Sequence, residues 1–458
     1  MDSLGPRLVA ALKGTEFEGQ TFFVGGCVRD RLLGLSRSPD LDIVTVSDAQ
    51  KLAGVLNSKG LLDRPPIVFP RFLTAMVSID GRQVELTTAR SEDYDPRSRK
   101  PSVRPASLDE DAVRRDFTIN ALYQSLDTRR IIDPLGRGMA DLNSKVLRTP
   151  IDPTKTFFDD PLRMMRAVRF RSQLGFTFAS GLVDSLKSQS GRMAVLSHER
   201  IRDELVKILH LPRPSGCLQE LVDLDLMPHV FACVADMCGC EQGGVHHKDV
   251  WGHTLDVIDL TDAQDLVLRL AALLHDCGKP AVKSIDPDGR IRFLSHETVG
   301  AKIVAQELLR LRFPKETVHR VSHLVRHHMR AGSAMILSSA AARRIIRDLG
   351  PQVGQWLSLV EADSGSLLPG NSTLDMQTIR SKIAEVQFVS SASQIKSPLT
   401  GQEIMEATGL GPGPEVGRLK SLLDEDVVEG RLKHDDKSGA YSLLDAHARN
   451  SYYNDIVS

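Results

Sequence analysis

Hydrophobic and polar positions between residues 21 and 90 alternate in a way that predicts strands and helices in turn. TFFV and LDIVTV are short apolar runs bounded by glycine or polar residues, which is typical of buried strands. DAQKLAGVLNSKG has helical spacing, and we expect Ser47 to cap this helix and Gly60 to end it. FLTAMVSIDGRQVELTTA predicts two strands joined at Asp80-Gly81, a strong hairpin signal. The pattern therefore predicts a small α/β module.

The pattern changes further along the chain. Residues 93–109 are polar and rich in proline and arginine, which predicts a long loop. From about residue 154 the apolar spacing is helical almost throughout, with a Ser-rich linker expected at 364–400 and the last helices at 401–458. The predicted fold class is therefore α+β, with a small mixed-sheet head followed by a long all-α body.

Composition is that of an ordinary globular protein, and its 458 residues suggest two to four structural units. The net charge is only −1, so any nucleic-acid surface must be a local cluster of basic residues. No apolar stretch reaches the ~18 residues of a membrane span and the N-terminus has no signal-peptide pattern, so we expect a cytoplasmic protein. The cysteines show no disulfide framework. Cys233, Cys238 and Cys240 are expected as buried thiols rather than as zinc ligands with His246 and His247.

Two features of the predicted head carry candidate chemistry. Gly25-Gly26 stand at a strand-to-helix turn, where glycines let a phosphate approach the backbone N–H groups, and Arg29 follows. Asp40 and Asp42 are two residues apart at the start of a strand, so both carboxylates would point to one face and would suit Mg²⁺. Taken alone, each feature is also typical of an ordinary turn or a solvated strand end.

The order of the motifs is more specific than any one motif. GGCVRDRLLG and DLDIVT are followed by RRDFTINAL at 114–122, DPLGRGMADL at 133–142, DDPLRMMRAVRF at 159–170 and HERIRDEL at 198–205. In this order they resemble the bacterial-type (class II) CCA-adding tRNA nucleotidyltransferases and their poly(A) polymerase relatives. The resemblance covers residues 21–205. It implies a polymerase-β-like nucleotidyltransferase head that acts on tRNA with CTP and ATP.

The resemblance also implies roles for the residues that match the motifs. Asp40 and Asp42 would hold two Mg²⁺ ions, with Glu85 either a third carboxylate or a solvent-facing strand residue. Asp160 and Arg163 would read the base as a protein template, because an aspartate accepts from the amine that cytosine and adenine share. Their alternative is an ordinary ion pair three residues apart on a helix. The other implied nucleotide contacts, to triphosphate and ribose, are Gly25, Gly26, Arg29, Arg115, Asp116 and Arg166. For Asp116, a salt bridge that caps a helix is the alternative.

A second group of possible metal ligands occupies the helical body. Histidines with carboxylates suit Mn²⁺, Fe²⁺, Ni²⁺ or Zn²⁺, and their order resembles that of HD-domain phosphohydrolases. This resemblance implies hydrolysis of phosphomonoesters or of 2′,3′-cyclic phosphates on damaged RNA ends. The implied primary ligands are His253, His275, Asp276 and Asp363, and the implied second-metal or phosphate contacts are His296 and His328. We expect His323 and His327 at the surface or behind the ligands.

Four domains follow from these assignments. They are a nucleotidyltransferase head at 1–150, a helical neck with the base-recognition motif at 151–215, an HD domain at 216–370 and C-terminal helices that contact tRNA at 371–458. In the last of these, GLGPGPEVG predicts a glycine-rich turn into a helix, able either to donate to an RNA phosphate or simply to connect two helices.

Three functions remain open at this point. The first is CCA addition. The second is one of its close relatives, namely A-only addition, CC-only addition or poly(A) polymerisation. RPPIVFPRFLTAM departs from the Gly-(Arg/Lys)₂-Phe stretch of poly(A) polymerases, and the long loop at 93–109 disfavours a CC-only enzyme. The third function is that of an HD phosphodiesterase with a vestigial head.

Overall fold

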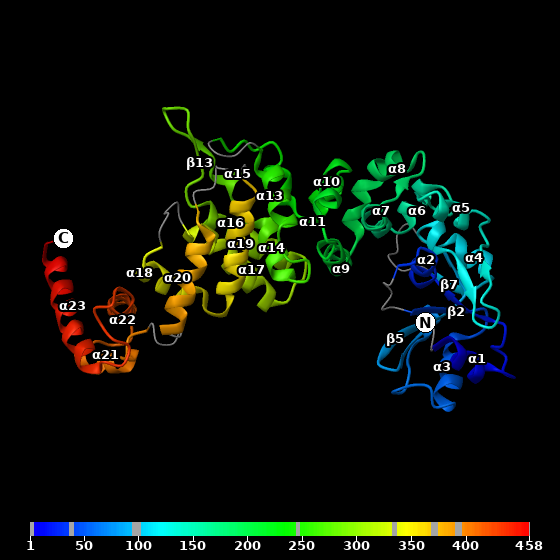
Figure 1. The fold of residues 1–458 in the computed structure, drawn as a ribbon, viewed down its shortest axis with the longest axis horizontal. Helices are drawn as coiled ribbons and strands as arrows, with labels where there is room; N and C mark the ends of the chain where they lie inside the picture. The colour runs from blue at the N-terminus through cyan, green and yellow to red at the C-terminus, as the bar shows by residue number, and fades with distance from the viewer. Residues whose placement is uncertain are drawn as a thin grey trace. The chain divides into compact units, whose positions relative to one another are not determined.

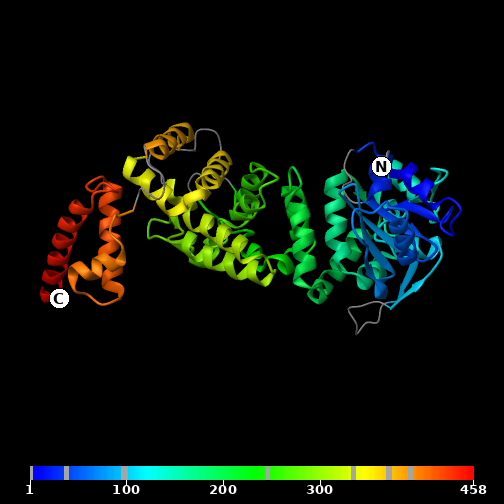
Figure 2. The same ribbon diagram turned by 90° about the horizontal axis from the view of Figure 1, so that it is seen from below.

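The computed structural model describes residues 4–35, 41–93, 102–243, 248–331, 337–367, 374–389 and 396–457. The chain divides into two compact units (Figures 1 and 2). The first comprises residues 1–211 and 216–230, and the second comprises 212–215 and 231–458. Within the described ranges, every helix is too short or too polar to span a lipid bilayer.

The first unit contains a seven-stranded mixed sheet in the order β3-β4-β5-β2-β1-β8-β9 (Figure 1). Strands β2 and β5 are parallel, and the other neighbours in this sheet are antiparallel. The strands are β1 (Thr21–Val24), β2 (Leu41–Thr45), β3 (Ile67–Phe69), β4 (Thr74–Ile79), β5 (Arg82–Thr88), β8 (Tyr123–Ser125) and β9 (Ile131–Ile132). The predicted strands of the α/β module are therefore present.

Alternation along β2 and β5 gives the sheet one face covered by a helix and an opposite face that is open beside Asp42 and Glu85, although Val24 and Val44 on that face are buried. Leu41 and Ile43 on β2 and Leu86 on β5 are at most 2% exposed. Helix α3 (Ala49–Ser58) packs against β4 and β5. Asp42 lies between two of these apolar residues and points the other way, as the two-residue period of a strand requires. Burial of one face thus directs the acidic residue to the opposite face.

Two local predictions about this module had different outcomes. Asp80 and Gly81 both have positive φ, 53° and 73°, as a tight hairpin between β4 and β5 needs. The predicted cap of α3 was wrong by one residue, since the side chain of Asp48, and not Ser47, accepts from the N–H groups of Gln50 and Lys51. A carboxylate at this position also interacts favourably with the helix dipole.

The prediction of a loop at 93–109 was wrong in part. Strand β6 (Arg90–Asp93) pairs antiparallel with β7 (Ser102–Pro105), and α4 (Leu108–Val113) starts after a capping box at Ser107. Residues 94–101 lie outside the described residues. Polar composition does not prevent pairing here, because most of the side chains of β7 are exposed.

Helices and short elements complete the first unit. Before and beside the sheet these are α1 (Leu4–Leu12), α2 (Gly26–Leu32), η1 (Pro70–Phe72), η2 (Thr118–Asn120), α5 (Gly138–Asn143) and β10 (Val146–Leu147). The helical neck follows, with α6 (Pro153–Asp159), α7 (Leu162–Leu174), β11 (Thr177–Phe178), α8 (Leu182–Gln189), η3 (Ser190–Val195), α9 (His198–Leu209), α10 (Ser215–Asp223) and α11 (Met227–Val230).

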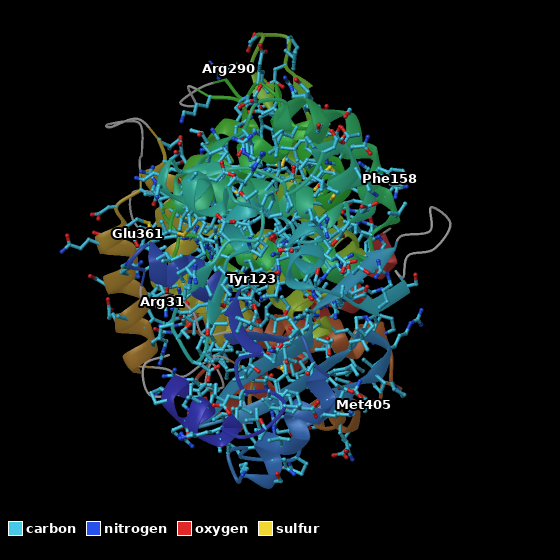
Figure 3. All side chains as sticks on the ribbon, turned by 90° about the vertical axis from the view of Figure 1, so that its right-hand side faces the viewer. Arg31, Tyr123, Phe158, Arg290, Glu361 and Met405 are labelled. Carbon is cyan, nitrogen blue, oxygen red and sulfur yellow. The ribbon has the colours of Figure 1, made fainter. Side chains whose placement is uncertain are left out.

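The second unit is almost entirely helical. Its helices are α12 (Ala232–Met237), α13 (Val250–Asp259), α14 (Leu266–Leu274), α15 (Lys279–Val282), α16 (His296–Arg310), α17 (Lys315–His327), η4 (His328–Ala331), α18 (Ser339–Leu349), η5 (Gly350–Gln352), α19 (Val353–Gly365), α20 (Met376–Val389), α21 (Gly401–Thr408), α22 (Pro414–Glu429) and α23 (Lys437–Val457). A small hairpin of β12 (Ser284–Ile285) and β13 (Ile291–Arg292) projects from it, with Arg290 near the tip (Figure 3).

Two predictions for the body need correction. The Ser-rich region 364–400 contains α20, whose inward positions Ile379, Ile383 and Val386 have helical spacing and are buried. Strand β11, which pairs with β10 of the head, and the pair β12–β13 are strands where helix alone was expected. Of the three cysteines expected to be buried thiols, Cys233 and Cys240 are buried, whereas Cys238 is only partly buried. His246 and His247 lie outside the described residues.

Candidate functional site

The turn between β1 and α2 brings backbone and carboxylate together. Gly25 has φ 77° and ψ −139°, a conformation that side chains rarely adopt. A Cβ atom at Gly25 would stand 3.3 Å from Asp42 Oδ2 and 3.8 Å from an Arg115 nitrogen. The turn therefore needs glycine for conformation and for space. It faces both an acidic and a basic side chain, as a site for a metal-bound phosphate requires.

Asp42 and Glu85 are direct neighbours across the sheet. They are register partners in the parallel pair β2–β5, so their side chains emerge on the same face. Both are partly buried, and Thr87 Oγ donates to Glu85 Oε1 at 3.4 Å. Asp40, the other predicted metal ligand, lies outside the described residues. The structure thus brings together two of the three predicted carboxylates beside the glycine turn.

Arg29 lies next to this turn, with a guanidinium nitrogen 3.6 Å from the position of a Cβ atom at Gly26. Its side chain is buried, and its guanidinium donates to Asp30 at 2.7 Å and to Asn120 at 2.8 Å. The ring of Phe170 lies 4.8 Å from the guanidinium carbon. These contacts fix the guanidinium beside the turn, and its contact with the triphosphate stays a prediction.

Arg115 is held at the turn by a buried carboxylate. Asp111, completely buried, accepts from Arg115 at 2.8 Å, from the Tyr123 hydroxyl at 2.8 Å and from Arg114 at 2.7 Å. Burial alone would raise the pKa of Asp111, but the charges of Arg115 and Arg114 outweigh it and hold that pKa well below its usual range. Asp111 therefore stays ionised and fixes the direction of Arg115.

Asp116 is part of a second buried network. Its Oδ2 accepts from Arg166 at 2.6 Å, and its Oδ1 accepts from the Asn120 side chain at 3.0 Å. Burial would raise the pKa of Asp116, but the charge of Arg166 outweighs it and lowers that pKa to about 2. Asn120 also binds Arg29, so one amide links both networks. Asp116 is thus engaged with protein groups on both of its oxygens.

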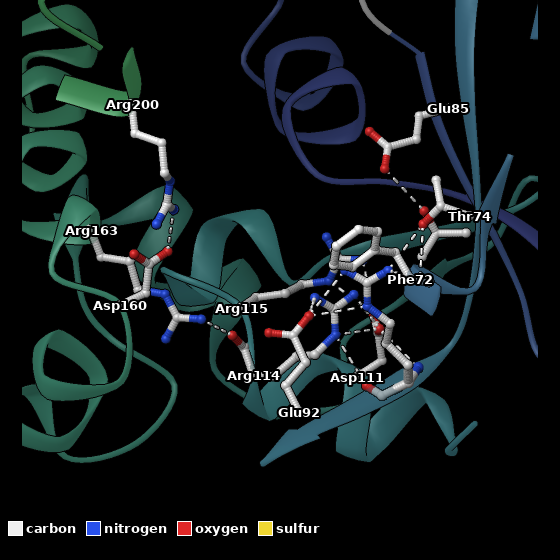
Figure 4. Close-up of polar contacts among 12 residues, drawn as sticks. Phe72, Thr74, Glu85, Glu92, Asp111, Arg114, Arg115, Asp160, Arg163 and Arg200 are labelled. Atoms are coloured by element: carbon white, nitrogen blue, oxygen red, sulfur yellow. Dashed lines mark hydrogen bonds and ion pairs between the residues drawn. The ribbon is translucent and has the colours of Figure 1, made fainter. Parts of the chain in front are cut away.

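Asp160 and Arg163 lie together at the start of α7 (Figure 4). The carboxylate of Asp160 accepts from the Leu162 N–H at 3.2 Å and from Arg200 on α9 at 2.9 Å. Arg163 is buried and donates to the backbone carbonyl of Arg114. Asp160 pairs with Arg200 and not with Arg163, so the alternative of an ordinary ion pair between Asp160 and Arg163 is not observed.

The second unit gathers the six predicted HD ligands into one place. They come from α13, the end of α14, α16, η4 and α19, which are separated by up to 110 residues. The ligand atoms form two sets, each with all atoms within 4.8 Å of one another. The first set is His253, His275 and Asp363, and the second is Asp276, His296 and His328.

Asp276 connects the two sets. Its Oδ2 lies 3.2 Å from His275 Nε2 and 3.9 Å from His253 Nε2. Its Oδ1 lies 3.4 Å from His296 Nε2 and 3.8 Å from His328 Nε2. One buried carboxylate therefore has an oxygen toward each set, so Asp276 could serve as a ligand to metal ions held by either set.

Each histidine has its Nδ1 atom occupied, which leaves Nε2 toward the centre. The Nδ1 atoms of His275, His296 and His328 lie 2.9, 2.8 and 2.7 Å from backbone carbonyls. That of His253 lies 2.9 Å from the Ser366 hydroxyl. This fixes orientation and tautomer, as partners behind metal ligands do. Burial lowers the pKa of His328 to about 4, which keeps it neutral.

The donor set fits divalent metal ions. His275 Nε2 is buried with no hydrogen-bond partner among the described residues, although Asp276 is close. A buried nitrogen of this kind is costly unless a cation takes its lone pair. Mixed nitrogen and carboxylate ligands suit first-row transition metals, whereas the carboxylates of the head suit a hard cation such as Mg²⁺.

Gly278 allows the second set to form. A Cβ atom at this position would collide with the backbone carbonyl of His296 and would stand 2.6 Å from Gly300 N. The close approach brings α16, and with it His296, against the end of α14. His323 and His327, which were expected outside the ligand sets, are partly exposed.

Several residues of these sites were not predicted. Lys279 Nζ lies 2.7 Å from Asp276 Oδ2 and donates to Gln242 at 2.6 Å. Its place three residues after Asp276 on a helical run was a usable signal. Arg200 was inside a recognised motif, but nothing in the sequence links it to Asp160, which is 40 residues away. Long-range partners of this kind need the fold.

Three domain families match the chain. They are the poly A polymerase head domain at residues 21–148, the probable RNA and SrmB-binding site of polymerase A at 175–238 and the HD domain at 247–371. The first contains the glycine turn with Asp42 and Glu85, and the last contains the six histidine and aspartate ligands. The match to the head-domain family and the match to the HD-domain family both imply dependence on divalent metal ions.

Individual proteins agree with these families. The A-adding tRNA nucleotidyltransferase of Deinococcus radiodurans is 35% identical over 72% of this chain and 77% of its own. The CC-adding tRNA nucleotidyltransferase of Thermus thermophilus is 32% identical over 92% of this chain and 93% of its own. The crystal structure of the Bacillus stearothermophilus CCA-adding enzyme in complex with CTP has the same fold, with a TM-score of 0.68 and 23% identity over 98% of both chains. The chain therefore belongs to the tRNA nucleotidyltransferase family with a poly(A) polymerase-type head, and it is a nucleotidyltransferase that carries an HD domain.

Proposed function

We propose that this protein completes the 3′ end of tRNA by adding C, C and A from CTP and ATP without a nucleic-acid template. The observation that carries the proposal is the position of Asp42. Its carboxylate lies against the Gly25 turn and is the register partner of Glu85. A phosphate-binding turn and a pair of metal-type ligands therefore share one point on the open face of the sheet.

In this proposal the head residues divide the work of nucleotidyl transfer. The RNA 3′-hydroxyl attacks the α-phosphorus, a new phosphodiester forms and pyrophosphate leaves. Asp40, Asp42 and Glu85 hold Mg²⁺, which when bound neutralises phosphate charge and lowers the pKa of the attacking hydroxyl. The backbone of Gly25 and Gly26 and the guanidinium of Arg115 bind the triphosphate. In the same proposal Arg29 contacts the triphosphate, Asp116 contacts the ribose, and Arg166 contacts the nucleotide and holds Asp116.

Base choice is assigned to Asp160 and Arg163. An aspartate can accept from the exocyclic amine of cytosine or adenine, and an arginine can donate to a ring nitrogen or a carbonyl. Uracil and guanine present a carbonyl in place of that amine, so they would leave the carboxylate unmatched. Arg200 holds one oxygen of Asp160 and so sets its orientation.

Relatives that add only A and only CC share this architecture, so the extent of addition must be measured. The paired strands β6 and β7 carry the segment that we expect to be shortened in CC-only enzymes, which disfavours CC-only addition but does not separate full CCA addition from A-only addition. The test uses α-labelled CTP and ATP with tRNA substrates that lack CCA, CA or A. Incorporation on all three supports full addition. Incorporation of only A, only CC or nothing identifies an A-adding enzyme, a CC-adding enzyme or a vestigial head.

We propose phosphohydrolysis as a second activity, on the specific observation that Asp276 faces both ligand sets. In this proposal His253, His275, Asp276, Asp363, His296 and His328 hold Mn²⁺, Ni²⁺ or Fe²⁺. Such ions, when bound, supply Lewis acidity toward a phosphate. Lys279 holds the Asp276 carboxylate by charge. Hydrolysis of p-nitrophenyl phosphate and of 2′,3′-cyclic AMP, with each metal added in turn, tests this activity and its substrate class.

We further propose that residues 371–458 contact the body of the tRNA. Helix α22 begins at Gly413-Pro414, directly after the glycine-rich turn, so its first N–H groups are available to a phosphate. Weaker tRNA binding by a variant with Gly411 and Gly413 replaced by aspartate, with unchanged CTP binding, is the expected result.

A further inference from the structure

An exposed apolar strip borders the open face of the head. We use the name edge strip for Ile67, Phe69 and Phe72, which are 53%, 43% and 41% exposed. Of the exposed aromatic side chains among the described residues, Phe69 and Phe72 are two of four, the others being Phe158 and Tyr441. The ring of Phe158 is already covered by Arg192 at 4.0 Å. Exposed rings are therefore scarce, and they are concentrated on this strip.

Strand register places Ile67 and Phe69, the two strip residues in β3, on the same face as the metal-type carboxylates. Asp42 pairs with Glu85, Glu85 pairs with Met76, and Met76 pairs with Ile67. Side chains at directly paired positions emerge on one side of a sheet. A continuous row therefore runs from Asp42 across β5 and β4 to the edge strand. Phe69 is two residues from Ile67 and faces the same side.

The geometry of nucleotidyl transfer indicates from which side the RNA terminus approaches this row of residues. Attacking and leaving oxygens lie roughly in line on opposite sides of the phosphorus. In the proposed function the triphosphate lies against the Gly25 turn, so pyrophosphate would leave on that side, toward β1. The attacking RNA terminus must therefore approach from the side of Glu85, across β4 and β3. Figure 4 shows Phe72 and Thr74 with Glu85, whereas Asp160 and Arg163 lie at the opposite side of the close-up.

We propose that the edge strip binds the unpaired 3′-terminal nucleotides of the acceptor RNA by base stacking. Stacking on aromatic rings accepts any base, which suits a terminus whose last nucleotide changes with every addition. Among the described residues, neither Phe69 nor Phe72 has a ring or cation contact of its own. Arg71, exposed between them, supplies charge for the backbone phosphates. This inference rests on the proposed function, because it names where that activity holds its RNA substrate.

The test compares Phe69→Ala and Phe72→Ala with the wild-type enzyme on tRNA lacking CCA. We expect the KM for tRNA to rise roughly tenfold for each variant. The KM for CTP and kcat at saturating tRNA should stay unchanged. Phe69→Trp should retain wild-type KM, and Phe69→Leu should not, because only the former keeps a ring. An acceptor-stem minihelix with 2-aminopurine as its last base gives a second readout, since stacking quenches its fluorescence without any turnover.

Leu294→Ala is the matched control, because this side chain is 76% exposed and lies in the second unit. An unchanged tRNA KM in both phenylalanine variants, or a rise in the CTP KM alone, would overturn the inference. A wild-type protein that forms concentration-dependent dimers in light scattering, lost in Phe69→Ala, would assign the strip to a second copy instead. Absence of nucleotide addition by the wild type would refute the proposed function. The effects of the variants test only whether the edge strip binds the RNA terminus.

Discussion

The two candidate metal sites of this chain differ in how many metal ligands the protein supplies in a fixed orientation. In the head, Asp42 and Glu85 stand side by side on adjacent strands, partly exposed and offering only oxygen atoms. In the second unit, six possible ligands, one of them the Asp276 carboxylate, lie close together, and the four histidines among them have their second nitrogen already bonded. Among the described residues, the first site therefore offers two carboxylates, and the second offers six possible ligands.

The difference follows from what each ion would do. A Mg²⁺ ion that arrives with a triphosphate obtains much of its coordination from phosphate oxygens and water, so the protein needs to supply only a few carboxylates. A resident transition metal must be held between turnovers, which requires several oriented nitrogen and oxygen donors. We therefore expect loss of a single ligand to affect catalysis in the head and to affect metal retention in the HD site.

The largest expected effect is that of Asp42→Ala. Without this carboxylate the site beside the Gly25 turn loses the charge that holds Mg²⁺, and nucleotide addition should fall by roughly a thousandfold or more. Hydrolysis of p-nitrophenyl phosphate should be unchanged, because its ligands belong to the other unit. Labelled CTP incorporation and phosphate release are measured on the same preparation, with Asp109→Ala, an exposed head carboxylate, as control. Loss of both activities together would contradict the division of the chain.

The reciprocal change, Asp276→Ala, should have the next largest effect. Both ligand sets lose their shared oxygen donor, so transition-metal affinity should fall by more than about a hundredfold. Metal content measured by mass spectrometry, together with phosphohydrolase activity, checks this expectation. CTP incorporation serves as the internal standard and should stay intact. Asp288→Ala, on the exposed hairpin turn between β12 and β13, is the control. Full metal content in Asp276→Ala would show that the carboxylate does not bridge.

A smaller effect is expected for base choice. Arg163→Ala should lower the preference for CTP over UTP by about 10- to 100-fold, which corresponds to about 1–3 kcal/mol for one lost contact. Triphosphate binding should change less, because the Gly25 turn and Arg115 remain. Single-turnover rates with both nucleotides measure the ratio directly. An unchanged CTP/UTP ratio would exclude Arg163 from base recognition.

The smallest effect concerns stability and pH. Asp116 has its pKa lowered from 3.8 to about 2, so its interactions with Arg166 stabilise the folded head by ~2 kcal/mol above the unfolded pKa. This stabilisation is lost as the pH falls from about 4 toward 2, because the folded pKa is the lower one. Urea unfolding at pH 6 and pH 3 should therefore show ~1 kcal/mol less pH dependence in Asp116→Asn than in the wild type. If the free energy of unfolding had the same pH dependence in both proteins, the partners of Asp116 would not lower its pKa.

Local patterns were enough to predict the elements around the head site. A period of two in LDIVTV and QVELTT predicts which side chains turn away from the core, and Asp42 and Glu85 both follow it. The hairpin at Asp80-Gly81 needed only its two turn residues. Predictions failed where composition was the only guide, as for β6 and β7, because polar strands on an exposed edge carry no apolar period.

The sequence by itself determined the kinds of ligand present, the order of the motifs and the helical or strand character of the elements that hold them. Only the tertiary structure decided which residues meet: Asp42 with Glu85 through strand register, Asp160 with Arg200 across 40 residues, and His253 with Asp363 across 110. The physical reason is range. Periodicity and turn chemistry act between neighbours along the chain, whereas a binding site is assembled by packing between elements that are distant in sequence.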